Sequence, residues 1–224
     1  MKKILFLCAF LALSVVVAAQ PSKGKIMLGG TAGFHSLSTY GIDAGFDKGR
    51  FGLSTFSINP GFDYFVGDKL SVGATLGYSN TWFKVISEGE NVLKLSLQNF
   101  SVSVTANYYI PVAGRFYISL NSSAEFGYNL LGGKYLSYDY MMDDYSNEDL
   151  DLMNGWTLGV RCVPTMNYFV TPSLLIRASF GGLRYQMGRM TPDRDMENIM
   201  ELKTGSHYFG FDWGKFEFGV AYCF

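Results

Sequence analysis

Residues 100–110 read FSVSVTANYYI, and apolar side chains alternate there with small polar ones. Phe100, Val102 and Val104 occupy alternate positions, which we call the apolar parity of the strand. Ser101 and Ser103 occupy the positions between them, which we call the second parity. A period of two residues is typical of a β-strand whose two faces meet different surroundings. The same alternation recurs along the chain. The eight candidate strands cover residues 25–35, 56–66, 70–79, 100–110, 116–128, 156–170, 174–180 and 216–224.

The connections between these strands alternate between short and long. The short ones, rich in turn-forming residues, cover 67–69, 111–115 and 171–173. The long ones cover roughly 36–53, 84–94, 129–155 and 186–206. In an antiparallel meander this order places all long loops at one end, and an even number of strands leaves both chain ends at the other.

The residues of the second parity distinguish a soluble sandwich from a membrane barrel. In a water-soluble β protein this parity carries many charges, whereas here it is mostly Ser, Gly, Thr and Asn. Small side chains suit a confined interior, and the apolar parity, with aromatics near strand ends, suits lipid. A set of strands in lipid has to close on itself because every backbone polar group needs a partner. The scattered charges assigned to the interior are Lys25, Asp63, Glu125, Arg161, Arg177, Lys215 and Glu217.

The sequence therefore predicts an all-β fold, a closed antiparallel eight-stranded transmembrane up-and-down β-barrel. A ten-stranded barrel is the alternative, because residues 135–145 or 183–190 could add or lengthen strands.

Composition excludes two other classes. Of 224 residues, 48% are hydrophobic and 17% aromatic, which is too apolar for a disordered chain. Lys and Arg number 18 against 19 Asp and Glu, so no basic excess is available for nucleic acid.

Residues 1–19 have the pattern of a signal peptide, with the barrel domain in residues 20–224. Lys2 and Lys3 precede an uncharged apolar run, and small residues end at Ala19, where we expect cleavage before Gln20. An uncleaved anchor is the alternative. Loss of Cys8 leaves Cys162 and Cys223, too few for a disulfide scaffold.

The last nine residues, FEFGVAYCF, carry the sharpest local signal. Five apolar residues share one face and end on the final Phe: Phe216, Phe218, Val220, Tyr222 and Phe224. This pattern resembles the C-terminal insertion signal read by the barrel insertion machinery. In layout, residues 20–224 resemble the small eight-stranded outer-membrane barrels, such as the OmpA transmembrane domain, OmpX and the opacity proteins. The resemblance implies a monomeric outer-membrane protein of a Gram-negative bacterium, surrounded by outer-membrane lipid and lipopolysaccharide.

The charges assigned to the interior affect whether a solute could pass through the barrel. Glu125 and Arg161 are on neighbouring strands, each nine positions from its short-turn end at Phe116 or Val170. We expect them to approach as a salt-bridge plug, unless strand stagger separates them. An eight-stranded lumen can be filled by side chains, but small inward residues leave a narrow porin-like channel open as an alternative.

Catalysis is the less favoured alternative. Two barrel enzymes that modify lipid A, a palmitoyltransferase and a deacylase, use His and Ser near the outer rim. The histidines here, His35 and His207, lie on strands that become neighbours on closure, but Leu37 and Phe209 replace the same-face Ser of the deacylase-like arrangement. We expect polar rim residues, no enzyme activity, and no cofactor or metal.

The longest predicted loop, 129–155, is acidic and rich in tyrosine. Carboxylates could attract Ca²⁺, but the Gly required at the sixth position of an EF-hand is absent. Tyrosine is enriched at protein interfaces, so this loop could contact a surface protein partner. Its acidic residues are Asp139, Asp143, Asp144, Glu148, Asp149 and Asp151, and its tyrosines include Tyr135, Tyr138, Tyr140 and Tyr145. We thus expect a structural or surface-interaction role, ahead of transport.

Overall fold

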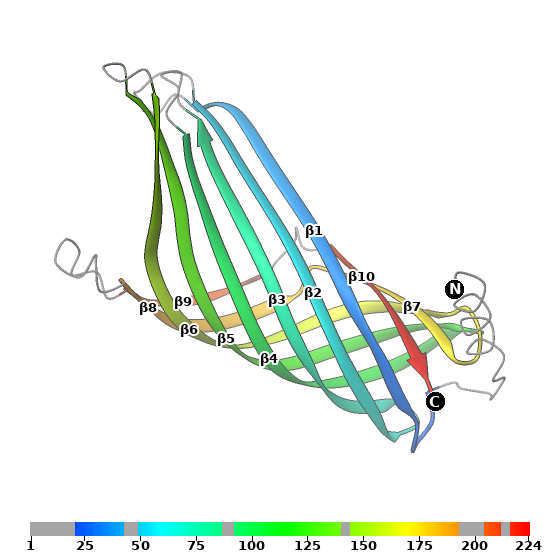
Figure 1. The fold of residues 1–224 in the computed structure, drawn as a ribbon. Coiled ribbons are helices and arrows are strands. Elements are labelled where there is room, and N and C mark those ends of the chain that lie inside the picture. The colour runs from blue at the N-terminus through cyan, green and yellow to red at the C-terminus, as the bar shows by residue number, and fades with distance from the viewer. Residues whose placement is uncertain (1–20, 43–48, 87–91, 140–143, 193–203, 212–215) are drawn as a thin grey trace, which may run out of the picture.

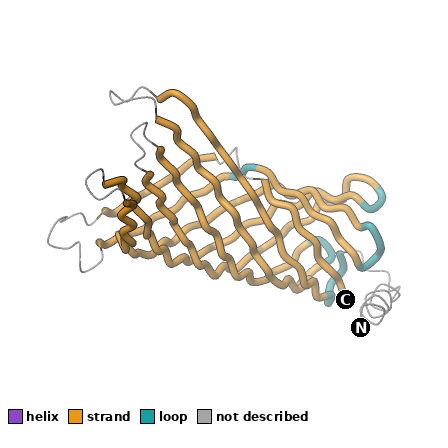
Figure 2. Tube along the Cα trace, turned by 45° about the horizontal axis from the view of Figure 1, so that its top comes forward, coloured by secondary structure: helices purple, strands orange, loops and turns teal. Residues whose placement is uncertain are grey.

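Antiparallel strands wind into a barrel in the computed structural model, which describes residues 21–42, 49–86, 92–139, 144–192, 204–211 and 216–224 (Figures 1 and 2). No helix in this part of the chain is long and apolar enough to cross a membrane. The strands are β1 (Ile26–Ile42), β2 (Gly49–Gly67), β3 (Leu70–Ile86), β4 (Val92–Ala113), β5 (Phe116–Asp139), β6 (Asp144–Phe169), β7 (Leu174–Phe180), β8 (Leu183–Pro192), β9 (Thr204–Phe211) and β10 (Phe216–Cys223).

The ten strand segments occupy eight positions in one hydrogen-bonded ring. β1 to β6 pair in chain order, and β6 then pairs with β7 through Thr165–Phe169 and with β8 through Met153–Cys162. β7 and β8 are therefore two parts of the seventh position. β8 pairs with β9, and β7 pairs with β10, so β9 and β10 share the eighth position. β10 then pairs with β1 and closes the ring. The predicted eight-stranded antiparallel barrel is confirmed.

Two glycines separate β7 from β8. Gly181 has φ 62° and Gly182 has φ 142°, and residues other than glycine rarely adopt these backbone conformations. The ladder to β6 is interrupted there and resumes at Leu183. The sequence prediction ended this strand at Phe180, because the alternation breaks at the two glycines.

The strands are much longer than predicted at one end of the barrel. β5 has 24 residues and β6 has 26, so most of the predicted loop 129–155 is strand. Parts of the predicted loops 36–53, 84–94 and 186–206 are strand as well. The backbone ladder continues where the strict side-chain alternation weakens, so alternation alone did not mark its end. The three predicted short turns are present, at 68–69, 114–115 and 170–173, although β2 runs through Gly67 and β4 through Ala113.

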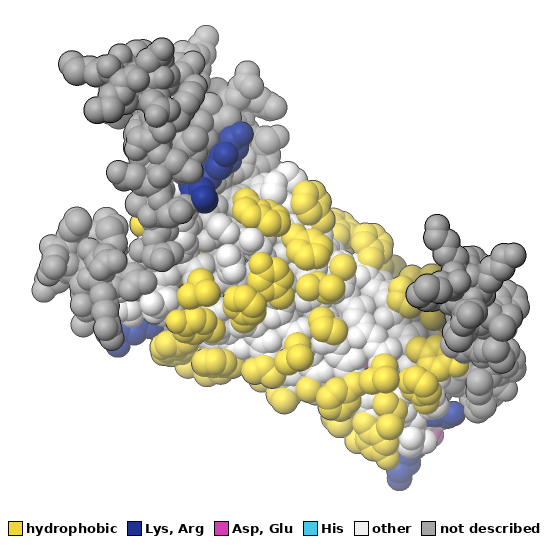
Figure 3. Space-filling model, viewed as in Figure 1, with side chains coloured by type: hydrophobic (Ala, Val, Ile, Leu, Met, Phe, Trp, Pro, Cys, Tyr) yellow, Lys and Arg dark blue, Asp and Glu magenta, His cyan; other side chains and the backbone are white. Residues whose placement is uncertain are grey.

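The two faces of the wall differ as predicted. Outward side chains such as Leu76, Val104 and Phe218 are exposed, at 63%, 64% and 64% of their surface. Inward side chains such as Ser71 and Asn107 are buried. The apolar side chains spread over the outer face in Figure 3. The apolar parity is thus on the outside of the barrel and the polar parity is inside.

Ring closure is established near the short turns. β1 pairs with β10 from Met27 to Gly33, with Met27 opposite Cys223. Farther along, within the described residues, the partner of Phe34–Ile42 is β2 and the partner of β9 is β8. We call the short-turn end of the barrel the base and the opposite end the outer end.

Candidate functional site

The lumen is closed at the base by an apolar cluster. Phe65 lies against Tyr109 with ring centroids 5.4 Å apart, and Tyr117 meets Phe169 edge-on at 5.5 Å. We call the whole cluster the base seal. Its members are Met27, Phe65, Tyr109, Tyr117, Phe169, Leu175, Ala221 and Cys223. This seal was not predicted, because the inward parity was interpreted as small and polar.

A signal for the base seal is present in the sequence. Four inward positions close to the short turns hold large apolar residues, namely Phe65, Tyr109, Tyr117 and Phe169. An apolar side chain on the inward parity beside every short turn indicates a closed end.

A buried polar layer lies directly above the base seal. The Asp63 carboxylate accepts hydrogen bonds from Asn107 Nδ2 at 2.8 Å and Thr105 Oγ1 at 3.2 Å. Asn107 also donates to Ser71 at 3.2 Å and accepts from Asn121. Side chains from several strands thus satisfy one another, and this cross-linking fixes the polar layer within the lumen.

Two ion pairs lie farther along the lumen, and neither is the predicted one. Arg161 pairs with Glu217 at 3.9 Å, and Glu125 pairs with Arg184 at 3.8 Å. Glu125 and Arg161 do line one small pocket, together with Arg184, but the expected salt bridge between them is wrong. Glu125 is opposite Gly159 in the β5–β6 ladder, whereas Arg161 is opposite Ser123 and donates to its hydroxyl at 3.2 Å.

The register explains that error. Phe116 pairs with Tyr168, not with Val170, so counting from the strand ends misplaced Arg161 by two residues. Arg184 was not among the predicted interior charges, because the seventh predicted strand ended at Phe180 and residues 183–190 counted as strand only in the ten-stranded alternative. Its signal is the continued alternation of Leu183 and Tyr185 with Arg184.

The seven predicted interior charges do not form one network. Asp63, Arg161, Arg177 and Glu217 line a common cavity of about 80 Å³. Arg177 also contacts Met27 of the base seal, with Nη2 3.3 Å from the sulfur. Glu125 belongs to the separate pair with Arg184. Lys25 precedes β1 at the base, and Lys215 lies outside the described residues.

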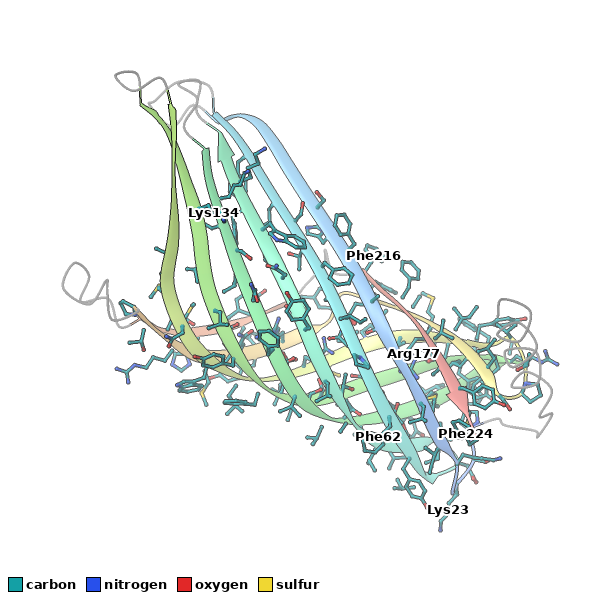
Figure 4. The ribbon with its side chains drawn as sticks, viewed as in Figure 1. Lys23, Phe62, Lys134, Arg177, Phe216 and Phe224 are labelled. Carbon is teal, nitrogen blue, oxygen red and sulfur yellow. The ribbon has the colours of Figure 1, made fainter. Side chains whose placement is uncertain are left out.

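The C-terminal strand has the orientation predicted for it. Its outward side chains are Phe216, Phe218, Val220, Tyr222 and Phe224. Tyr222 and Phe224 meet edge-on at 4.8 Å, and Figure 4 shows Phe216 and Phe224 at opposite ends of β10. Recognition by the insertion machinery stays a prediction.

The two histidines are on different strands and have different neighbours. His207 lies against Tyr185, whose hydroxyl is 3.3 Å from Nδ1, and it is exposed. His35 is opposite Thr55 in the β1–β2 ladder. No contact joins the two in the described part of the chain. The absence of catalysis stays an expectation.

Two other predictions fall on residues that lie wholly or partly outside the described part of the chain. The signal peptide, residues 1–19, and the loop residues Tyr140 and Asp143 lie outside the described residues. Asp139 belongs to β5, and Asp144, Glu148, Asp149 and Asp151 belong to β6. Both remaining cysteines are free thiols: Cys162 is on the outer face, and Cys223 is in the base seal.

Several solved structures match this chain along nearly its whole length, the outer membrane protein OprG among them. OprG from Pseudomonas aeruginosa is 15% identical, with 93% of this chain and 99% of that chain aligned and a TM-score of 0.47. Ail of Yersinia pestis is 11% identical over 90% of this chain and 99% of its own, with a TM-score of 0.38. Neisserial surface protein A is 18% identical over 89% and 97%, with a TM-score of 0.36.

The predicted layout of a small eight-stranded barrel is confirmed by the strand pairing described above, which establishes the ring of eight positions without these matches. No protein-family model matches the chain, and no curated protein sequence matches it.

Proposed function

We propose that this chain is an integral protein of the bacterial outer membrane, with a closed barrel that presents long hairpins at the cell surface. The observation that carries the proposal is the exposed apolar outer face. At each of the eight strand positions, large apolar side chains of the outer face are 37–75% exposed, Phe126 at 49% and Val160 at 54% among them. An apolar surface of this extent in water would aggregate, whereas lipid covers it.

Aromatic pairing on the outer face supports a membrane interface. Tyr78 is opposite Phe100 with ring centroids 5.1 Å apart, Phe100 is opposite Tyr128, and Tyr128 is opposite Trp156. Four aromatic residues therefore follow one another across β3 to β6. Aromatic side chains gather where the hydrocarbon meets the headgroups.

The base seal favours a structural role over transport. A permeating solute would have to pass Phe65, Tyr109, Tyr117 and Phe169, which are at most 9% exposed. The cavity of about 80 Å³ above them has room for a few water molecules. The barrel thus serves as an anchor, and interaction belongs to its outer end.

The β5–β6 hairpin is the best candidate for that interaction. Its ladder runs from Phe116–Tyr168 at the base to Asp139–Asp144 at the outer end. At about 3.3 Å per residue, 24 residues extend roughly 80 Å, more than a tilted strand needs to cross the hydrocarbon core. The excess projects beyond the membrane and carries the tyrosine-rich and acidic segment.

Membrane insertion is tested by fractionation and by gel migration with and without heating. We expect the protein in the outer-membrane fraction, with a folded band that shifts on boiling. Recovery from the soluble fraction would refute the proposal.

The surface role is tested by replacing residues 136–150 with a two-residue turn. We expect unchanged insertion but reduced attachment to neighbouring or host cells. Unchanged attachment would contradict this role. Large, steady conductance of the intact protein in planar bilayers would instead favour the porin-like alternative.

A further inference from the structure

Three lysines stand side by side on the outer face near the outer end of the barrel. Lys84 of β3 is directly opposite Lys94 of β4, and Lys94 is directly opposite Lys134 of β5. All three are exposed. Since neighbouring strands are about 4.8 Å apart, the three backbone positions span roughly 10 Å. We call these residues the lysine row.

The lysine row is unfavourable in the isolated barrel. Like charges directly opposite one another on a sheet repel and destabilise it. The same ladder row continues to Asp149 of β6, opposite Lys134, and to Gly52 of β2, opposite Lys84. The row therefore holds three positive charges and one negative charge. Within the described residues neither Lys84 nor Lys94 has an ion-pair partner, so an external anion would relieve the repulsion.

An apolar hollow of about 690 Å³ adjoins the lysine row. The three lysines line it together with Trp82, Leu130 and Met153. Trp82 is 43% exposed and Leu130 is 39% exposed. Ser96, at the hollow, donates its hydroxyl to Asn80 at 2.8 Å, whereas the exposed ammonium groups of Lys84 and Lys94 are positive charges open to a ligand there. A matching ligand is anionic at one end and apolar at the other.

The position of the site limits the kind of ligand. Lys84 is on the outer face, six residues beyond the aromatic Tyr78 on the same strand, about 20 Å along it. Figure 3 shows a cluster of basic side chains at the upper end of the apolar face, and Figure 4 places Lys134 near that end, opposite the end with Lys23. The site thus lies where the headgroups of outer-leaflet lipids meet the wall.

We propose that the lysine row binds a lipid headgroup with two or more phosphates, of the kind that lipid A carries. Three lysines whose backbone positions span roughly 10 Å match several phosphates better than one, and the hollow accepts part of an acyl chain. Clusters of lysine beside a membrane bind anionic headgroups. This inference rests on the proposed outer-membrane location.

The test measures binding of diphosphorylated lipid A to the full barrel folded in uncharged detergent. The variant Lys84→Gln/Lys94→Gln is compared with Lys23→Gln/Lys69→Gln, which removes two exposed lysines from the base. Each lysine contributes about fivefold in affinity near an anionic surface, so we expect a roughly 30-fold loss for the first variant. The second variant should keep the affinity of the unmodified chain, and Lys84→Arg/Lys94→Arg should restore most of it.

The controls separate the sources of phosphate. We expect dephosphorylated lipid A and phosphatidylglycerol to bind at least tenfold more weakly, and inorganic phosphate to compete only at millimolar concentration. Equal binding by the two double variants, or by the dephosphorylated lipid, would overturn the proposal. Equal competition by inorganic phosphate would also overturn it.

Heat-modifiable migration of each preparation reports insertion separately. If the barrel inserts but does not distinguish phosphorylated from dephosphorylated lipid A, only the lipid site is refuted. A chain that forms no membrane barrel at all refutes the proposed function as well.

Discussion

The base and the outer end of this barrel are built from the same strands but differ in what holds them. At the base, β10 closes the ring, the base seal fills the lumen, and Asp63 and Asn107 join neighbouring strands through hydrogen bonds. At the outer end the strands run on as long hairpins, and the wall carries the lysine row. Stability is thus concentrated at the base and interaction at the outer end.

The difference shows how side-chain burial assigns roles within one sheet. Tyr108 and Tyr109 are adjacent in β4, yet Tyr108 is 50% exposed on the outer face and Tyr109 is 1% exposed in the base seal. The same residue type therefore contacts lipid at one position and closes the lumen at the next. Paired substitutions can separate the two contributions.

The largest effect is expected from Tyr109→Ala, which leaves a cavity in the base seal. Truncating a buried aromatic residue lowers the free energy of unfolding by about 3–5 kcal/mol. Tyr108→Ala, the matched control, should lower it by about 1 kcal/mol or less in detergent. Urea titrations of both variants make the comparison, and equal losses would contradict a stability centred on the base seal.

The next largest loss of stability is expected from disrupting the β1–β10 pairing that closes the ring. A Cβ at Gly29 would collide with Ala221 and the Val220 backbone across the β1–β10 seam, whereas at Gly52 it would meet nothing within 4 Å. We expect Gly29→Val to lower the free energy of unfolding by about 2–3 kcal/mol and to reduce the folding yield. Gly52→Val should change it by less than about 0.5 kcal/mol. The fraction of heat-modifiable protein after refolding measures the yield, and a normal yield for Gly29→Val would argue against this seam.

A smaller effect is expected from the ion pairs. Glu217 pairs with Arg161 and accepts a hydrogen bond from Thr31 at 3.2 Å, so Glu217→Gln should lower the free energy of unfolding by about 1–2 kcal/mol. Glu125→Gln should have a weaker effect because the Glu125–Arg184 pair is more exposed. Denaturant titration tests this order. Neither variant should conduct, because the base seal remains, and a conducting Glu217→Gln barrel would show that the ion pair closes the lumen.

The smallest change in stability is expected at the lysine row. Without anionic lipid, Lys84→Gln/Lys94→Gln should raise the free energy of unfolding by up to about 0.5 kcal/mol, because a like-charge pair is removed. Unfolding in uncharged detergent measures this. A clear loss of stability would mean that these lysines support the wall itself.

The sequence predicted the strands and faces better than it predicted the contacts. Alternation assigned the outward face, and turn-forming residues located the short turns, since both are local signals. The partners of Glu125 and Arg161 depend on a ladder register, which shifts by two residues without changing the alternation. Predicting Arg184 as the partner of Glu125 required extending the seventh strand beyond the break at Gly181 and Gly182.

The membrane barrel requires the even-numbered side chains of β5 to face lipid and the odd-numbered ones to face the lumen. Single spin labels placed at each residue from Ile118 to Leu130, in a cysteine-free background and a lipid bilayer, test it directly. Oxygen, which concentrates in lipid, should reach labels at Leu120, Ala124 and Phe126 far better than labels at Ser119, Ser123 and Glu125. An accessibility with no period of two, or with the opposite phase, would contradict the account.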